Sequence, residues 1–151
     1  MTDTRWAAAK DVRGRSFGAV AADYAAWRPS YPADVVAFLV GGGERRRVLD
    51  LGAGTGQLSE PLLAAGHDVV AVDTSADMLA QLAVRLPGVP TFVAGAEDLP
   101  LPDADVDVVV AGQAAHWFDP ARASAEFRRV LRPGGAVGLT WHTRELSLIH
   151  I

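Results

Sequence analysis

Val48-Leu-Asp-Leu-Gly-Ala-Gly-Thr-Gly-Gln57 is the stretch of the chain that decides its fold. Its apolar first half predicts a short buried strand, and three glycines follow at the alternate positions 52, 54 and 56. Glycine leaves a turn without side chains, so a ligand can lie against bare backbone while the amides of the next helix point at it. The stretch therefore predicts a strand, a ligand-binding glycine turn and a helix.

The spacing of the glycines separates the ligand classes that use such turns. A phosphate loop needs Gly-Lys-Ser or Gly-Lys-Thr after four spacer residues, and the chain has no such tripeptide. A dinucleotide-binding G-x-G-x-x-G that begins at Gly52 needs glycine at the position of Gln57. What remains is G-x-G-x-G after Asp50, a form that resembles motif I of class I S-adenosylmethionine (SAM) dependent methyltransferases.

A second acidic residue ends the next apolar run, His67-Asp-Val-Val-Ala-Val-Asp73. A carboxylate at the tip of the second strand can accept both hydroxyls of a ribose. The alternative is that Asp73 caps the helix that begins near Ser75, but Thr74 and Ser75 can already fill that role. We therefore interpret Asp73 as a ribose ligand.

Apolar strands and amphipathic helices alternate along the chain after a first helix over 33–40 that stops at glycines 41–43. The expected strands are 46–51, 68–73, 90–94, 105–111 and 135–142, and the expected helices are 56–65, 75–85 and about 119–130, with a loop over 95–104. Near-continuous apolar strands favour a parallel sheet that is covered on both faces. The sequence predicts an α/β fold with a doubly wound, mostly parallel sheet and a ligand beyond the carboxyl ends of its strands.

Composition narrows the classes of function. The 151 residues are 50% hydrophobic and 21% charged, as in a single globular domain, and the net charge of -4 disfavours a nucleic-acid partner. The basic run 45–47 is interpreted as a solvated edge. The chain has no cysteine, and its four histidines lack ligand spacing, so we expect no metal. With no long apolar run, we expect a cytoplasmic protein without a membrane partner; the oligomeric state is left open.

With these motifs placed, the chain resembles a class I methyltransferase over roughly residues 16–142, and within that class the type 11 small-molecule group. Residues 17–32 (FGAVAADYAAWRPSYP) are similar to the group's N-terminal signature, which implies a helical cap over the cofactor. The resemblance implies SAM as the cofactor. It implies these cofactor-binding residues: Tyr24 and Arg28 at the methionine end, Asp50, Gly52, Ala53 and Gly54 at the amino-acid portion, Asp73, Thr74 and Met78 at the ribose and adenine side, Ala96 and Glu97 at the adenine edge, and Gln113 after the fourth strand.

Two matching blocks depart from the group's usual pattern. In the block over 93–102, Gly95 stands where an Asp is frequent, so the adenine contact is expected through the Ala96 amide and Glu97. The alternative for Glu97 is a solvated loop. In the block over 111–119, His116 is the candidate to orient or deprotonate an acceptor, although a packed structural histidine is the interpretation we favour. Asp119 is expected to cap the following helix.

Methyl transfer from a sulfonium requires the protein to bind the cofactor, align the acceptor and exclude water. The chain lacks Asn/Asp-Pro-Pro-Tyr after its fourth strand and lacks a nucleophilic cysteine, both of which base methylases use. A small organic acceptor, methylated on oxygen, nitrogen or carbon, is therefore expected. The alternatives are a catalytically inactive nucleoside-binding module or truncated remnant, and an NAD-dependent oxidoreductase, which Gln57 and the lack of a Tyr/Lys pair disfavour.

The expected boundaries are a flexible segment over 1–16, a SAM-binding domain over 17–145 and a non-native tail over 146–151, because LSLIHI resembles a translated sequencing-adaptor tail. Members of the class continue to strands six and seven, so the chain is interpreted as the truncated N-terminal portion of a longer enzyme. The fifth expected strand then forms a sheet edge, and we expect the chain to be marginally stable or aggregation-prone.

Overall fold

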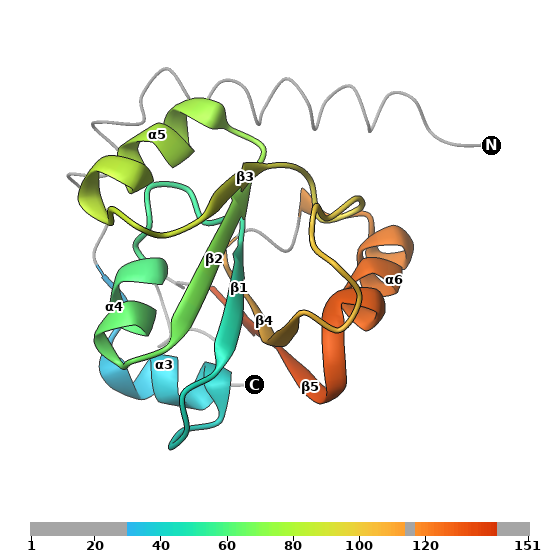
Figure 1. Ribbon diagram of the computed structural model, residues 1–151, viewed down its shortest axis with the longest axis horizontal. Helices are drawn as coiled ribbons and strands as arrows, with labels where there is room; N and C mark the ends of the chain where they lie inside the picture. Colours follow the sequence, from blue (N-terminus) through green and yellow to red (C-terminus); the bar gives the residue numbers. More distant parts are fainter. Residues whose placement is uncertain (1–29, 114–116, 142–151) are drawn as a thin grey trace, which may run out of the picture.

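A computed structural model describes residues 30–113 and 117–141 of the chain (Figure 1). The described strands form one sheet in the order β3-β2-β1-β4-β5, and each neighbouring pair is parallel. This arrangement confirms the predicted doubly wound α/β fold. The elements in chain order are α3 (Ala33–Val40), β1 (Arg47–Leu51), α4 (Ser59–Ala64), β2 (Asp68–Asp73), α5 (Ala76–Arg85), β3 (Thr91–Val93), β4 (Val106–Gly112), α6 (Pro120–Val130) and β5 (Leu131–Thr140).

Helices cover both faces of the sheet, with α3 and α4 on one side and α6 on the other (Figure 1). Successive side chains of a strand point to opposite faces, so Val48 packs with α3 and α4 whereas Leu49 packs on the side of α6. The central strands are therefore apolar on both faces, as in other covered parallel sheets. This double packing fixes the carboxyl ends of β1, β2 and β4 at one edge of the molecule.

The fifth strand differs from its prediction. It begins at Leu131 rather than at residue 135, because the Arg-Pro-Gly-Gly segment interrupts the strand as a bulge instead of preceding it. Leu131 pairs with Val106 and Ala136 pairs with Val108, so residues 132–135 protrude from the ladder. Helix α4 also begins later than predicted, at Ser59, because the glycine turn extends through residue 58.

The two outer strands of the described sheet carry exposed apolar side chains. Val93 of β3 is 61% exposed, and Val137 and Leu139 of β5 are 42% and 41% exposed. The expected edge position of the fifth strand is thereby confirmed within the described residues. No helix among residues 30–113 and 117–141 is long and apolar enough to cross a membrane.

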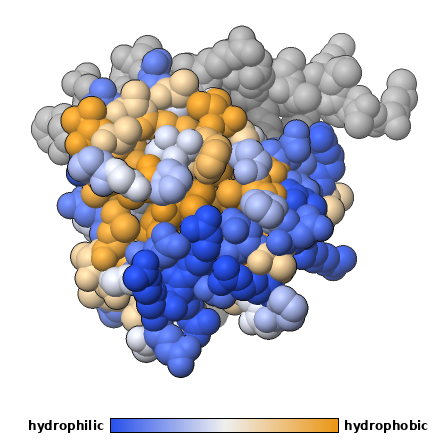
Figure 2. All heavy atoms as spheres, viewed as in Figure 1, coloured by the Kyte–Doolittle hydropathy of each residue, from blue (hydrophilic) through white to orange (hydrophobic). Residues whose placement is uncertain are grey.

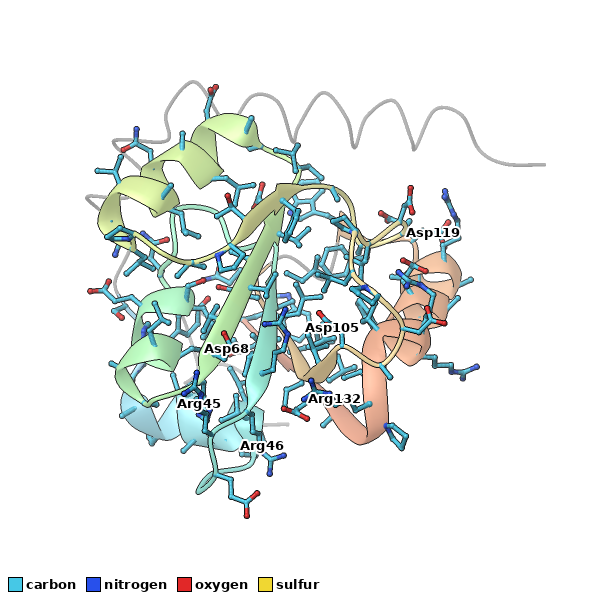
Figure 3. The ribbon with its side chains drawn as sticks, in the orientation of Figure 1. Arg45, Arg46, Asp68, Asp105, Asp119 and Arg132 are labelled. Carbon is cyan, nitrogen blue, oxygen red and sulfur yellow. The ribbon has the colours of Figure 1, made fainter. Side chains whose placement is uncertain are left out.

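Charged side chains gather at the amino ends of the strands (Figure 3). They form the hydrophilic lower part of the face that Figure 2 shows. Arg47 forms ion pairs with Asp68 at 3.0 Å and with Asp105 at 3.2 Å, and Arg132 pairs with Asp107 at 3.1 Å. Within the basic run, Arg47 cross-links β1, β2 and the start of β4 through ion pairs that stay partly exposed. The glycine turn lies at the opposite edge of the sheet, at the carboxyl end of β1.

Candidate functional site

The glycine turn lies over the end of the neighbouring strand β2. The backbone amides of Gly52 and Ala53 both donate to the carbonyl of Val72, at 2.8 and 3.0 Å. Gly52, Gly54 and Gly56 all have positive φ, at 70°, 57° and 96°. L-residues rarely adopt this region, so the sequence uses glycine here for backbone shape as well as for access.

Gly54 and Gly56 face different surroundings. A Cβ atom added at Gly54 would have no heavy atom of the described residues within 4 Å, so its backbone borders open space in this part of the structure. A Cβ atom at Gly56 would lie 3.0 Å from Leu86 and 3.1 Å from Leu82, both of the α5 region. Gly54 is therefore the glycine against which a ligand can lie, and Gly56 lets the turn pack against α5.

Asp73 joins the glycine turn to the start of α5. Its Oδ2 accepts the amide proton of Gly54 at 2.9 Å, and its Oδ1 accepts that of Ser75 at 2.8 Å. Burial raises the pKa of the Asp73 carboxyl, although these backbone hydrogen bonds oppose the shift. A carboxylate has about four lone-pair sites, so the Asp73 carboxylate keeps acceptor capacity beyond these backbone hydrogen bonds. Ser75 itself caps α5 by accepting from the amide of Met78 at 3.2 Å, so Asp73 is not the N-cap residue of this helix.

Asp50 lies beneath the turn, with an exposed fraction of 1%. The Ser59 hydroxyl donates to its Oδ2 at 2.6 Å, a distance typical of a hydroxyl that donates to a carboxylate. A buried carboxylate requires donors of this kind. The sequence prediction missed Ser59, and the available signal was its position as a polar residue in the first turn of α4, nine residues after the acidic one.

The far side of the turn is held by two further polar side chains. The Arg85 guanidinium in the last turn of α5 donates to the carbonyl of Thr55 at 2.6 Å and pairs with Glu60. The Thr55 hydroxyl donates to Gln57 Oε1 at 2.7 Å, whereas Gln57 Nε2 is buried without a hydrogen-bond partner among the described residues. Sequence reasoning also missed Arg85, which acts across thirty positions of the chain.

The loop after β3 lies beside Asp73, because the amide of Ala94 donates to the Asp73 carbonyl at 3.0 Å. In this loop Glu97 Oε1 accepts the amide proton of Asp119 at 2.8 Å, so the solvated alternative for Glu97 is wrong. A Cβ atom at Gly95 would stand 2.8 Å from Glu97 Oε2. The Glu97 carboxylate thus occupies the space that a side chain at position 95 would need, which accounts for Gly95.

The carboxyl end of β4 lies at the same edge of the sheet as the glycine turn and Asp73. The Tyr31 hydroxyl lies against Gly112, where an added Cβ atom would overlap it. Gln113 follows with a φ of +59°, and its amide donates to the carbonyl of Thr140 at 2.8 Å. The Asp119 side chain accepts from two amides of the first turn of α6, which confirms the predicted helix cap.

The structure brings most of the predicted cofactor residues to one edge of the sheet. Thr74 is exposed there, Met78 is buried in α5 with 4% exposure, and Ala96 is buried with 2% exposure. Three predicted residues lie outside the described part of the chain, namely Tyr24, Arg28 and His116. No described group of His, Cys, Asp or Glu is placed to hold a metal ion within residues 30–113 and 117–141.

Comparison with known proteins gives this edge a family context. A family model described as a methyltransferase domain matches residues 49–139. A methyltransferase of Mycobacterium tuberculosis (strain ATCC 25618 / H37Rv) is 50% identical over 133 residues, which cover 88% of this chain and 54% of that protein. A malonyl-[acyl-carrier protein] O-methyltransferase of Pectobacterium atrosepticum is 39% identical over 92 residues, which cover 60% of this chain and 36% of that protein.

The solved structures agree with the sequence comparison. A type II methyltransferase structure from Anaeromyxobacter dehalogenans has a TM-score of 0.68 and 43% identity, over 78% of this chain and 50% of that one. The chain spans about half the length of the M. tuberculosis relative, with 54% of that protein covered. The matched region contains the glycine turn, Asp73 and the loop after β3, so the chain belongs to the type 11 methyltransferase domain family.

Proposed function

We propose that this protein is an SAM-dependent methyltransferase that transfers a methyl group to a small organic acceptor. One observation carries the proposal, namely the hydrogen bond from the Gly54 amide to the Asp73 carboxylate beside open space at Gly54. It places a bare backbone surface next to a carboxylate with spare acceptor capacity. A nucleoside fits both features, because its ribose hydroxyls can donate to the carboxylate while the rest of the molecule lies against the backbone.

The residues of this edge fit SAM in three parts. The glycine turn above Asp50 would hold the amino-acid portion, Asp73 would accept the ribose hydroxyls, and Ala96 and Glu97 would contact the adenine. Gln57 Nε2, which is buried without a hydrogen-bond partner among the described residues, is a further donor next to the turn. When bound, SAM supplies a methyl group on a sulfonium that is already activated for displacement.

The chain's own residues then have positioning tasks. Asp73 and the Val72 carbonyl hold the glycine turn in one conformation, so no reorganisation is needed when the nucleoside binds. Gln113 at the end of β4, strained at a positive φ, borders the same edge and is proposed to contact the cofactor. His116, the candidate to orient or deprotonate the acceptor, lies outside the described residues and stays a prediction.

Calorimetric titration with S-adenosylhomocysteine tests the proposal, with NAD titrated in parallel. We expect micromolar binding of S-adenosylhomocysteine and no binding of NAD. Asp73→Ala is expected to abolish the binding. Asp77→Ala, an exposed acidic residue four positions later in α5, is the matched control and is expected to bind as the wild type does. A folded wild-type chain that fails to bind S-adenosylhomocysteine would contradict the proposal.

Turnover distinguishes the enzyme from a nucleoside-binding module. With radiolabelled SAM and a panel of small carboxylic acids, phenols and amines, transfer of label to one acceptor class supports the proposal. Binding of S-adenosylhomocysteine without transfer to any acceptor supports the module instead.

A further inference from the structure

Residues 95–105 run beside α6 and are attached at both of its ends (Figure 1). At one end of the segment, Glu97 accepts the amide proton of Asp119, directly before the helix. At the other end, the amides of Ala104 and Asp105 donate to the last carbonyls of α6 at 2.9 and 2.8 Å. The conformation of this segment is therefore coupled to the position of α6.

One guanidinium holds the middle of the segment. Arg129 of α6 donates to the carbonyl of Leu99 at 2.9 Å and to that of Leu101 at 2.7 Å. It also bonds Asp103 at 3.0 Å, and it binds both oxygens of Glu126 at 2.8 Å. Glu126 in turn accepts the amide proton of Leu99 at 2.7 Å. Both backbone groups of Leu99 are thereby satisfied by this one pair of side chains.

The geometry explains why this pair is arginine and glutamate. The side chains of Leu99 and Leu101 are buried, at 4% and 7% exposure, so their backbone groups need partners from the protein. Only arginine offers a planar fork of five donors that can reach two carbonyls and a carboxylate together. Hydrogen bonds from Arg129 lower the pKa of Glu126 to about 2, so the pair stays ionised over the working range of the protein.

The same segment borders the nucleoside side of the site. The Ala94 amide bonds the Asp73 carbonyl, so the residues that follow it begin next to the proposed ribose ligand. Ala96 and Glu97 lie between this point and the Arg129 contacts. The base of a nucleoside whose ribose lies at Asp73 would meet the segment at these residues.

We propose that Arg129 and Glu126 are positioning residues that set the shape of the base-binding segment and thereby its preference for adenine. The inference rests on the proposed function. A purely structural network would change stability and affect every nucleoside ligand equally. A positioning role predicts a selective loss of discrimination between purine bases.

The test uses Arg129→Lys, with Arg128→Lys at the adjacent exposed position as the matched control. Calorimetry gives Kd values for S-adenosylhomocysteine and for its hypoxanthine counterpart, and hydrogen exchange follows the amides of residues 95–105. Wild type and Arg128→Lys are expected to prefer adenine at least tenfold. Arg129→Lys is expected to raise the Kd for S-adenosylhomocysteine about tenfold and to change the Kd for the hypoxanthine counterpart less than threefold. It is also expected to lose hydrogen-exchange protection only in residues 95–105.

The outcomes separate the two proposals. A wild type that binds neither ligand overturns the proposed function and this inference with it. A wild type that discriminates, together with an Arg129→Lys variant that discriminates equally or weakens both ligands equally, overturns this inference alone. If Arg129→Lys does not fold, Glu126→Gln takes its place, because the amide retains one oxygen for Leu99 while its NH2 group replaces the oxygen that accepts from Arg129 Nε. It is expected to reduce the adenine preference at least threefold, and an unchanged preference would overturn the inference.

Discussion

Replacement of Gly54 by alanine is expected to separate ligand binding from folding at the glycine turn. Gly54 has a φ of +57°, and no atom of residues 30–113 or 117–141 lies within 4 Å of where its Cβ atom would stand. The folded chain can therefore accept the methyl group for about 1–2 kcal/mol, the usual penalty of an L-residue in the left-handed region. Because the nucleoside is proposed to lie in that same space, the Kd for S-adenosylhomocysteine should rise at least tenfold, or about 1.4 kcal/mol.

Two other glycines provide matched comparisons. Gly42, in the loop after α3, has a φ of +66° and no neighbour within 4 Å, so Gly42→Ala should lower stability to a similar extent and leave the Kd unchanged. Gly56 has a φ of +96° and would place its Cβ atom 3.0 Å from Leu86 and 3.1 Å from Leu82. Overpacking adds to the backbone penalty there, so Gly56→Ala should be destabilised by roughly 2–4 kcal/mol.

Urea unfolding gives the free energy of unfolding for the three variants, and calorimetric titration gives the Kd. The reasoning requires that Gly54→Ala loses binding while its stability matches that of Gly42→Ala. If Gly54→Ala binds S-adenosylhomocysteine with the wild-type Kd, no ligand lies against this backbone. If Gly42→Ala also loses binding, the effect comes from general destabilisation and the proposed site is wrong.

Three further predictions concern other parts of the edge and the sheet. Binding of S-adenosylhomocysteine should weaken as the pH falls and Asp73 is protonated. Because burial raises the pKa of Asp73, this loss should begin above the usual carboxyl pKa of 3.8. Calorimetry over a range of pH should show no such step in Asp73→Asn. Gln113→Gly and Ala104→Gly should each stabilise the fold by about 0.5–1 kcal/mol in urea unfolding, because each relieves a positive φ. Only Gln113→Gly should alter the Kd for S-adenosylhomocysteine. Val137→Lys and Leu139→Lys together should reduce self-association of the chain in analytical ultracentrifugation. An unchanged sedimentation profile would mean that the chain does not self-associate through β5.

Periodicity was sufficient to predict most of the fold. β2 spans Asp68–Asp73 as expected because its apolar run ends abruptly at polar residues on both sides. β5 was placed too late because Pro-Gly-Gly is typical of a turn, whereas here it forms a bulge whose strand resumes pairing at Ala136. The order of the strands depends on contacts between distant segments, and it could be inferred only from the general rule for alternating strands and helices.

The candidate site was predictable where a residue's role depends on its place after a strand. The glycine turn and Asp73 meet this condition, and the structure brings them together through the Gly54 amide. Ser59, Arg85 and Arg129 were missed because each acts on backbone or carboxylate groups of another element, at separations of nine to thirty positions. A charged residue on a helix gives no sequence signal that distinguishes such a partner from solvent.

The sequence separations within the sheet have a consequence for the order of folding. Arg47 and Asp68, which pair across β1 and β2, are 21 positions apart, whereas Arg47 and Asp107, which join β1 to β4, are 60 apart. Shorter loops close at a lower entropic penalty, so β1 and β2 are expected to dock first. That pair already contains the glycine turn and Asp73, so the half of the site that is proposed to bind the ribose would form before β4 docks. Nucleoside present during refolding should therefore accelerate folding as well as slow unfolding.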